Sequence, residues 1–303
     1  EEAMERIRGL EGQLKSALEK CAAERQGRIR AQQSLREALS RTSCDTPGSC
    51  LYPMAPIGVV HSCFSTRNGT PRQALLVPLA RATLKFDSSR VPEASLEGIE
   101  GYSHCWIIFI FHLNTDMEKL WRDPSRSGFK AKVRVPRLKG ERVGVFATRS
   151  PHRLCPIGLT VAKVEARHGH EVLVSDVDLV DGTPILDIKP YLPYCDSVDG
   201  AQVPPWVKED NALAVASITL SEGFSSSLQD CWSRAEGKSG HVSSPEELVG
   251  LIKQVLLWDI RSVSQRKRRS SVDEDVYRLV LECFHVWYRI DDNADVVVEK
   301  VGL

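Results

Sequence analysis

The stretch CWIIFIF, residues 105–111, decides the fold class. It is rich in aromatic and β-branched residues, as strands are, and it is far too short to span a bilayer. Similar short runs recur between turn residues, and several of them alternate apolar and polar positions. They are IGVVH (57–61), ATLKF (82–86), KVRV (132–135), GVFA (144–147), TVAKV (160–164) and EVLV (171–174). Helices do not alternate with these runs, which argues against a parallel α/β sheet and favours a closed or nearly closed barrel.

Composition is that of an ordinary globular protein. The chain has 303 residues, 42% of them hydrophobic and 26% charged, and its formal net charge is zero. This length suits about two domains. The nine cysteines are odd in number and form no CxxC pair, which argues against a disulfide framework or a structural zinc site and for a reducing compartment. No signal segment is present, so we expect a cytoplasmic protein without a metal or a membrane anchor.

The N-terminal residues 1–41 predict one helix, because they lack proline and are rich in Glu, Lys, Arg, Gln, Ala and Leu. With Ile7 at heptad position a, most a and d positions are apolar or small, and the break at Glu24 and Arg28 is central. This pattern predicts a weak coiled coil. A solvated amphipathic helix that leans on its own domain is the alternative.

The remaining chain divides by composition into four parts. They are a linker over 42–55, a β-barrel over 56–198, a Ser- and Gly-rich flexible connection over 199–244, and a small α+β subdomain over 245–303. In the last part we expect a helix over 245–260, capped by Ser244 and followed by two strands over 275–290 and 296–301. The fold class is therefore mainly β, with helical additions at both ends.

Nucleotide and metal signatures are missing from the sequence. No GxGxxG follows an expected strand, and neither a GKS/GKT nor an HExxH motif occurs. Three loops combine turn residues with polar groups instead, and loops on a rigid barrel often carry binding sites. They are NGTPRQ (68–73), ATRSPHRLCPIGLT (147–160) and DLVDGTPILDIKPY (178–191). Each of them alone is also compatible with a plain tight turn.

These loops, together with PIGVVHS (56–62) and LEGIEGYSHCW (96–106), resemble the TsaA-like family, which includes the TrmO-type tRNA methyltransferases. The resemblance covers residues 56–198 in unbroken order, and WDIR (258–261) matches a short Asp-x-Arg segment of the family. It implies a homodimeric β-barrel that binds S-adenosyl-L-methionine. It also implies methylation of N6 of N6-threonylcarbamoyladenosine, the base 3′ of the anticodon in certain tRNAs.

The cofactor site is carried over by motif. The resemblance implies contacts from Pro71, Arg72, Gln73, His112, Leu113, Arg149, Asp178, Leu179, Asp181, Gly182, Thr183 and Pro184. This chain departs from the family at Leu154 and Cys155, where a proline and an asparagine are usual. That departure puts cofactor affinity in doubt.

Methyl transfer needs positioning of the methyl group and a group that accepts a proton from adenine N6. The candidate acceptors are Asp181, His152, Tyr191 and Asp187. Asp181 ranks first, because an aspartate that opens a Gly-Thr-Pro turn is expected at a loop tip. The alternative is that Asp181 only caps its own turn through backbone N–H groups.

The charge distribution predicts an RNA partner. Residues 121–153 hold ten Lys and Arg against Asp123 and Glu141, whereas 171–199 hold seven Asp and Glu against one Lys. A basic belt is typical of phosphate binding, although a solvated face looks similar. The run RKRRSS (266–271) contacts the anticodon arm in one interpretation, acts as a nuclear-localisation signal in a second, and is a solvated loop in a third. In the first, phosphorylation of its serines would oppose RNA binding.

Three functions remain. The first is a SAM-dependent tRNA methyltransferase. The second is a weakly active or inactive TsaA-like module that binds tRNA or a protein, with the coiled coil as a scaffold. The third and weakest is a coiled-coil adaptor that binds its partners through residues 1–41 alone.

Overall fold

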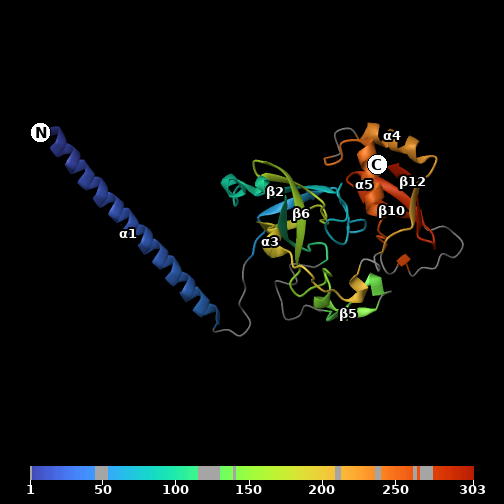
Figure 1. Ribbon diagram of the computed structural model, residues 1–303, viewed down its shortest axis with the longest axis horizontal. Coiled ribbons are helices and arrows are strands. Elements are labelled where there is room, and N and C mark those ends of the chain that lie inside the picture. Colours follow the sequence, from blue (N-terminus) through green and yellow to red (C-terminus); the bar gives the residue numbers. More distant parts are fainter. Residues whose placement is uncertain are drawn as a thin grey trace. The chain divides into compact units, whose positions relative to one another are not determined.

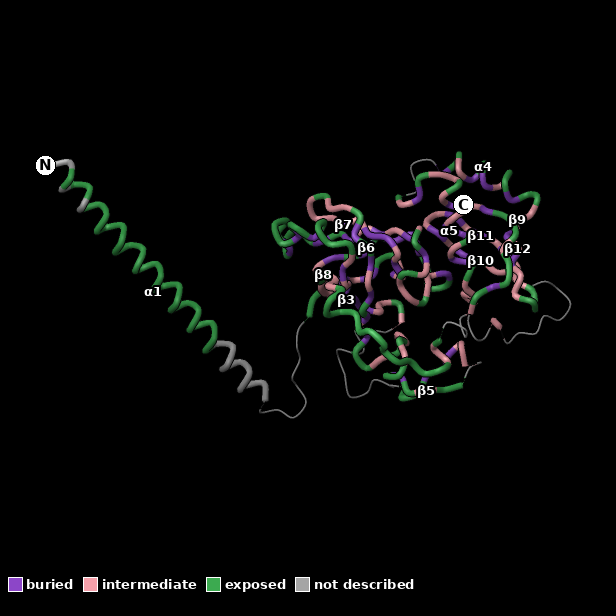
Figure 2. The backbone as a smooth tube through the Cα atoms, viewed as in Figure 1, coloured by how far each residue is buried: buried purple, intermediate pink, exposed green. Residues whose placement is uncertain are grey.

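A computed structural model describes residues 2–44, 54–114, 130–138, 141–208, 213–235, 240–261, 265–266 and 276–303. The chain forms two compact units, residues 1–54 and 55–303. The first unit contains the helix α1 (Glu2–Cys44), which confirms the expected N-terminal helix. All its described side chains are exposed, including Ile7, Leu10 and Leu14 (Figure 2). Its pairing in a coiled coil stays a prediction.

The second unit begins with the expected closed barrel (Figure 1). Six strands close it in the order β1-β2-β7-β6-β3-β8, and all neighbouring pairs are antiparallel. The strands are β1 (Gly58–Ser62), β2 (Arg81–Phe86), β3 (His104–Ile110), β6 (Ile157–His168), β7 (Glu171–Ser175) and β8 (Pro184–Pro190). Alternate residues such as Val60, Leu84 and Ile107 fill the interior and are fully buried. The period-2 pattern of the sequence therefore closes one core.

Shorter elements lie in the barrel's connections. The hairpin of β4 (Lys132–Arg134) and β5 (Arg142–Gly144) precedes β6 and buries Val133 and Val135. It leaves Lys132, Arg134 and Arg142 exposed. The helical turns are η1 (Glu93–Leu96), η2 (Ile99–Gly101), η4 (Pro136–Leu138), η5 (Val145–Ala147), α3 (Pro193–Asp196) and η6 (Pro205–Val207).

The C-terminal subdomain is α+β, as expected. Its sheet has the order β10-β11-β12-β9, and β9 runs parallel to β12. The elements are β9 (Ser217–Leu220), α4 (Phe224–Arg234), α5 (Pro245–Leu256), β10 (Tyr277–Leu281), β11 (Phe284–Ile290) and β12 (Asp295–Gly302). Ser244 caps α5 by accepting the Glu247 backbone N–H at 3.1 Å, as the sequence predicts.

Two details of this subdomain differ from expectation. The segment 199–244, expected as a flexible connection, contains β9 and α4, because Phe224, Leu228 and Cys231 recur at helical spacing and bury one face. The strand expected over 275–290 is two strands, since Glu282 adopts a left-handed backbone conformation (φ 51°) that reverses the chain.

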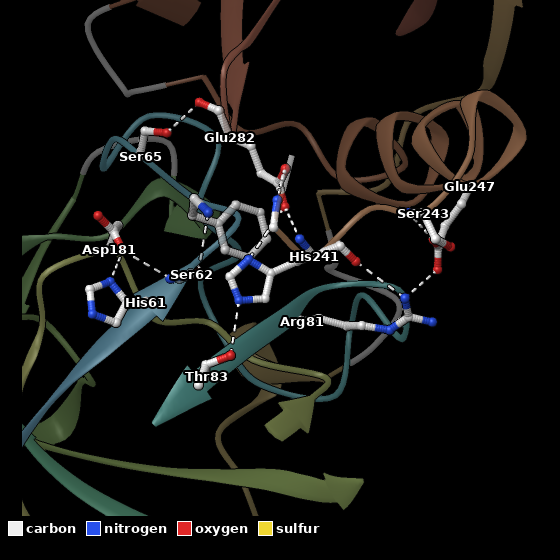
Figure 3. A network of polar contacts seen from close by, with 12 residues as sticks. His61, Ser62, Ser65, Arg81, Thr83, Asp181, His241, Ser243, Glu247 and Glu282 are labelled. Carbon is white, nitrogen blue, oxygen red and sulfur yellow. Dashed lines mark hydrogen bonds and ion pairs between the residues drawn. The ribbon is translucent and has the colours of Figure 1, made fainter. Parts of the chain in front are cut away.

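Barrel and subdomain share one continuous hydrophobic core and several polar contacts (Figure 3). His241 lies between the Glu282 carboxylate, 3.3 Å away, and the Thr83 hydroxyl, 3.3 Å away. Arg81 of β2 pairs with Glu247 of α5 at 2.6 Å. No described helix is both long and apolar enough to cross a membrane.

Candidate functional site

Three loops meet at one end of the barrel. They follow β1, precede β6 and precede β8, so each contains part of one of the three polar segments of the sequence. The backbone joins the first loop to the third, because Leu75 N–H donates to Asp176 O at 3.0 Å. Segments that are far apart in the sequence therefore form one rim.

The first polar group on this rim contains Gln73, Arg149 and Asp178, one residue from each loop. Arg149 Nη1 donates to Gln73 Oε1 at 3.3 Å. The Asp178 carboxylate accepts the Thr160 hydroxyl at 2.6 Å. Burial raises the pKa of Asp178, while the Thr160 hydroxyl, the Ala74 backbone N–H and the Arg149 charge oppose this rise. A cation and a half-buried carboxylate thus lie on the same rim.

The second polar group surrounds Asp181, whose side chain is half exposed (Figure 3). Asp181 Oδ1 accepts the backbone N–H of Ser62 at 3.0 Å and lies 3.7 Å from His61 Nδ1. The backbone N–H of Asp181 donates to Phe64 O at 2.8 Å. The carboxylate therefore caps the end of β1 rather than its own turn, and it keeps one face open to solvent.

His112 approaches Asp181 from the end of β3. A Cβ at Gly182 would lie 3.8 Å from His112 Nε2, and Gly182 has φ +76°, which favours glycine. Burial lowers the pKa of His112, although a backbone hydrogen bond and the Asp181 charge raise it. The neighbouring Phe111 N–H donates to Pro156 O at 2.8 Å, so the turn after β3 lies beside the loop before β6.

The rim has the groups that an S-adenosyl-L-methionine molecule requires. The donor carries a carboxylate, an ammonium and a sulfonium, and Arg149 can pair with the first while Asp178 and Asp181 can pair with the cations. Asp178 is half-buried with a raised pKa, and an ionised carboxylate of this kind gains when a cation binds beside it. The charges of the rim therefore fit this cofactor.

Comparisons with known proteins show the family. A family model described as the tRNA-methyltransferase O N-terminal domain matches residues 59–197. The tRNA (adenine(37)-N6)-methyltransferase of Escherichia coli is 30% identical over 246 residues, which are 80% of this chain and 94% of that protein. The chain belongs to the tRNA-methyltransferase O family.

Solved structures and mammalian relatives extend this similarity. The crystal structure of TrmO from Pseudomonas aeruginosa matches with a TM-score of 0.60 and 28% identity, over 84% of this chain and 100% of that one. A mouse protein called tRNA (adenine(37)-N6)-methyltransferase is 44% identical over 173 residues, or 53% of this chain. The chain spans 38% of the length of that mouse protein.

Some residues expected from the TrmO family are placed where their side chains do not face the rim. Leu179 is 1% exposed and belongs to the core. Thr183 is 3% exposed, and its hydroxyl donates to Val180 O at 2.5 Å. At Leu179 and Thr183 only the backbone is left to contact a ligand. Pro184, the first residue of β8, pairs with Val59 and is half-buried, so its expected contact stays a prediction.

Other expected residues surround the rim or turn away from it. Leu113 is 47% exposed and follows His112, while Pro71 is half-buried. Arg72 donates from Nη2 to Arg261 O at 2.9 Å, so it faces the C-terminal subdomain, whereas the next residue, Gln73, faces Arg149.

The candidate proton acceptors are not all brought together. His152 is exposed in the loop before β6, and its backbone N–H donates to Ser150 Oγ at 3.3 Å. Tyr191 follows β8 at the opposite end of the barrel, where its ring lies 5.5 Å from that of Trp106. Asp187, inside β8, pairs with Lys189 at 2.7 Å. Within one chain the structure therefore does not place Tyr191 with Asp181.

Sequence reasoning missed His61 and Thr160. His61 faces outward on β1 and becomes a neighbour of Asp181 only because the loop before β8 packs on β1. Thr160 was quoted as the end of a polar loop, yet it lies in β6 and bonds Asp178. Its polar side chain at a buried strand position was the available signal.

The two departures from the family pattern, Leu154 and Cys155, and the described part of the basic belt are accessible to solvent. Leu154 is 46% exposed and Cys155 is exposed, so neither fills the core. Of the ten cations of the belt, the structure describes seven, namely Lys130, Lys132, Arg134, Arg137, Arg142, Arg149 and Arg153. Ser270 and Ser271 lie outside the described residues.

Proposed function

We propose that this protein is a SAM-dependent tRNA methyltransferase that acts on N6 of the adenine at position 37, with N6-threonylcarbamoyladenosine as the substrate base. The observation that carries the proposal is the one rim that carries both the group of Gln73, Arg149 and Asp178 and the oriented carboxylate of Asp181. The named relatives support it, because the Escherichia coli protein is called a tRNA (adenine(37)-N6)-methyltransferase and matches along most of both chains.

In the proposed mechanism the residues of the rim divide the work. Bound S-adenosyl-L-methionine supplies a methyl group attached to a sulfonium. Arg149, oriented by Gln73, would hold the carboxylate of the cofactor, and Asp178 would hold one of its cationic groups. Asp181 accepts the proton that leaves adenine N6, and its hydrogen bond from Ser62 holds the carboxylate in place. His61 lies beside Asp181, with its Nδ1 3.7 Å from Asp181 Oδ1.

The exposed cations of the β4–β5 hairpin complete the proposal. Lys132, Arg134 and Arg142 alternate with inward-facing residues, so they form a surface suited to phosphates. We also propose the homodimer that the resemblance implies. Sedimentation of the full chain tests that assembly independently of activity.

A SAM-binding test separates the enzyme from the binding module. For a bound cofactor at ~100 times its Kd, stability increases by about 2.7 kcal/mol. We expect this gain in the wild type and in Arg278→Ala, a control at an exposed position on β10. We expect it to be reduced in Arg149→Ala. An absent shift in the wild type would favour the binding module.

A second test asks whether the substrate base is N6-threonylcarbamoyladenosine rather than unmodified adenosine. The protein is incubated with S-adenosyl-L-methionine and with tRNA that carries or lacks the threonylcarbamoyl group. Nucleoside mass analysis should find the methyl group only on the threonylcarbamoylated base. Equal methylation of unmodified adenine would refute this specificity and leave the methyltransferase activity intact.

A further inference from the structure

A second set of cations lies where the loop after β1 meets the C-terminal subdomain. Gly69 of this loop has φ +101°, and a Cβ there would overlap Leu279 Cδ1 at 2.1 Å. The loop is thus packed against the subdomain. Three residues further along, Arg72 Nη2 donates to the carbonyl oxygen of Arg261 at 2.9 Å.

A second guanidinium, that of Arg266, lies at the same carbonyl group, and the guanidinium of Arg261 itself lies nearby on Asp259. Arg261 donates to both oxygens of Asp259, from Nε at 3.0 Å and from Nη2 at 3.1 Å. Arg266 Nη2 also donates to Arg261 O, at 2.9 Å, and its Nε lies 3.6 Å from Asp259 Oδ2. The side chains of Arg261 and Arg266 are each 17% exposed, so these charges are largely removed from solvent.

The cluster contains more positive than negative charge. Arg72, Arg261 and Arg266 surround one carboxylate, which leaves two positive charges in excess among these four residues. Arg137 adds to the positive potential at Arg72 while its own guanidinium donates to Val207 O at 2.7 Å. Burial, Arg266 and Arg137 lower the pKa of Arg72, although Asp259 raises it. Bringing like charges together raises the electrostatic free energy of the folded protein, and a bound anion lowers it again.

The open side of the cluster suits an oxyanion with several acceptor oxygens. The Nε of Arg266 is buried and makes no hydrogen bond among the described residues, and it lies 3.6 Å from the Asp259 carboxylate, so it belongs to the inner side of the cluster. Arg72 is an exposed residue, so the cluster is open to solvent on one side. Guanidinium groups with free N–H groups prefer phosphates and carboxylates, which accept several hydrogen bonds at once.

We propose that Arg72, Arg261 and Arg266, supported by Arg137, bind a backbone phosphate of the tRNA. This inference rests on the proposed function, since it assigns part of the substrate's binding surface. It also gives Arg72 a role different from the cofactor contact that the resemblance implies. Phosphate is favoured over the cofactor's carboxylate because Arg72 donates to the carbonyl oxygen of Arg261, whereas Gln73 faces the rim. Asp259 orients Arg261, and its negative charge reduces the repulsion among the guanidinium groups.

The test measures tRNA binding by the full chain without S-adenosyl-L-methionine, as a function of KCl concentration. Each phosphate contact contributes about 1 to the slope of log K against log salt. We expect Arg72→Ala and Arg266→Ala each to reduce the slope by about 1. Arg72→Lys and Arg266→Lys should keep the slope, because they keep the charge, but weaken binding. The control Arg278→Ala should match the wild type.

Two outcomes would overturn the proposal, and the second of them would assign the anion to the cofactor. Slopes of Arg72→Ala and Arg266→Ala equal to that of the wild type would overturn the proposal. A loss of SAM affinity in Arg72→Ala as large as in Arg149→Ala, with an unchanged salt slope, would assign the cluster to the cofactor and also overturn it. Thermal melting of each variant shows that it folds, and Arg72→Ala, the most exposed member, provides the result if Arg266→Ala does not fold.

The same experiment separates this inference from the proposed function. Binding is measured without methyl transfer. A wild type that shows the salt effects but no methylation would contradict the proposed function and leave the phosphate site standing. Normal methylation with unaltered slopes in the variants would contradict the phosphate site alone.

Discussion

The carboxylate of Asp181 accepts the backbone N–H of Ser62 at 3.0 Å, although 119 positions separate the two residues. This hydrogen bond connects the end of β1 to the loop before β8 and fixes one carboxylate oxygen. The side chain remains 49% exposed, so its other side is available to a substrate. A carboxylate that is oriented but not enclosed is suited to accepting a proton.

Asp181→Asn tests this role. The amide oxygen still accepts the Ser62 N–H, so the melting temperature should change little. The rate of methylation should fall by about 10² to 10⁴, the usual contribution of a general base. Initial rates with saturating tRNA measure this effect, and Asp292→Asn, at an exposed turn before β12, is the matched control. A rate within twofold of the wild type would remove Asp181 from the mechanism.

The pKa of His112 predicts a pH dependence of cofactor binding. Burial lowers this pKa below 6.5, so the imidazole is neutral at pH 7 and becomes a cation as the pH falls through its pKa. An imidazolium on the rim repels a sulfonium. SAM affinity should therefore be constant near pH 7 and fall at lower pH. In His112→Gln that fall should be smaller, as measured by calorimetry from pH 5 to 8; an identical pH profile contradicts the assignment.

The raised pKa of Asp178 predicts that this carboxylate supports cofactor binding but lowers the stability of the protein at pH 7. Burial raises its pKa above 3.8, so the folded state holds this proton more tightly than the unfolded state. The resulting stability is fully present below pH 3.8 and is lost as the pH rises through the folded pKa. At pH 7 Asp178→Asn should therefore melt at a higher temperature than the wild type while binding S-adenosyl-L-methionine more weakly. A lower melting temperature at pH 7 counts against this interpretation.

Gly158 predicts a packing defect that a second substitution relieves. A Cβ at Gly158 would lie 2.2 Å from Phe109 Cζ, because the ring of Phe109 lies over the paired glycine. Gly158→Ala should destabilise the protein by about 1 to 3 kcal/mol through overpacking. Gly144→Ala is the control, since nothing lies within 4 Å of its Cβ.

Phe109→Leu should recover part of that loss in the Gly158→Ala background. Denaturant unfolding of the four chains in a double-mutant cycle measures the coupling. Additive effects of the two substitutions would show that the Phe109 ring is not the cause.

The barrel was predictable because the sequence of each strand alternates between residues that face the core and residues that face solvent. Residues such as Ala82, Leu84 and Phe86 alternate with exposed or half-exposed neighbours, and this period-2 pattern needs no distant information. The cap of α5 was predictable for the same reason, since Ser244 and Pro245 act on the adjacent turn. Local chemistry also indicated the three loops of the rim.

Features that depend on distant contacts were not predictable. His61 joins the site only when the loop before β8 packs beside β1. The residues around Ser227 indicated a mobile segment by composition, yet Phe224 and Leu228 anchor a helix in the C-terminal core. Arg72 was assigned by motif to the cofactor, whereas its partner Arg261 is 189 positions away.

The most direct test follows the methyl group itself. Wild-type protein, Arg149→Ala and Asp181→Asn are incubated with S-adenosyl-L-methionine that carries a trideuterated methyl group and with threonylcarbamoylated tRNA. The proposal predicts a trideuteromethyl group on N6 of the base at position 37 with the wild type, and a strong loss of it with both variants. A wild type that leaves this base unlabelled, or variants that label it at the full rate, would contradict the proposal.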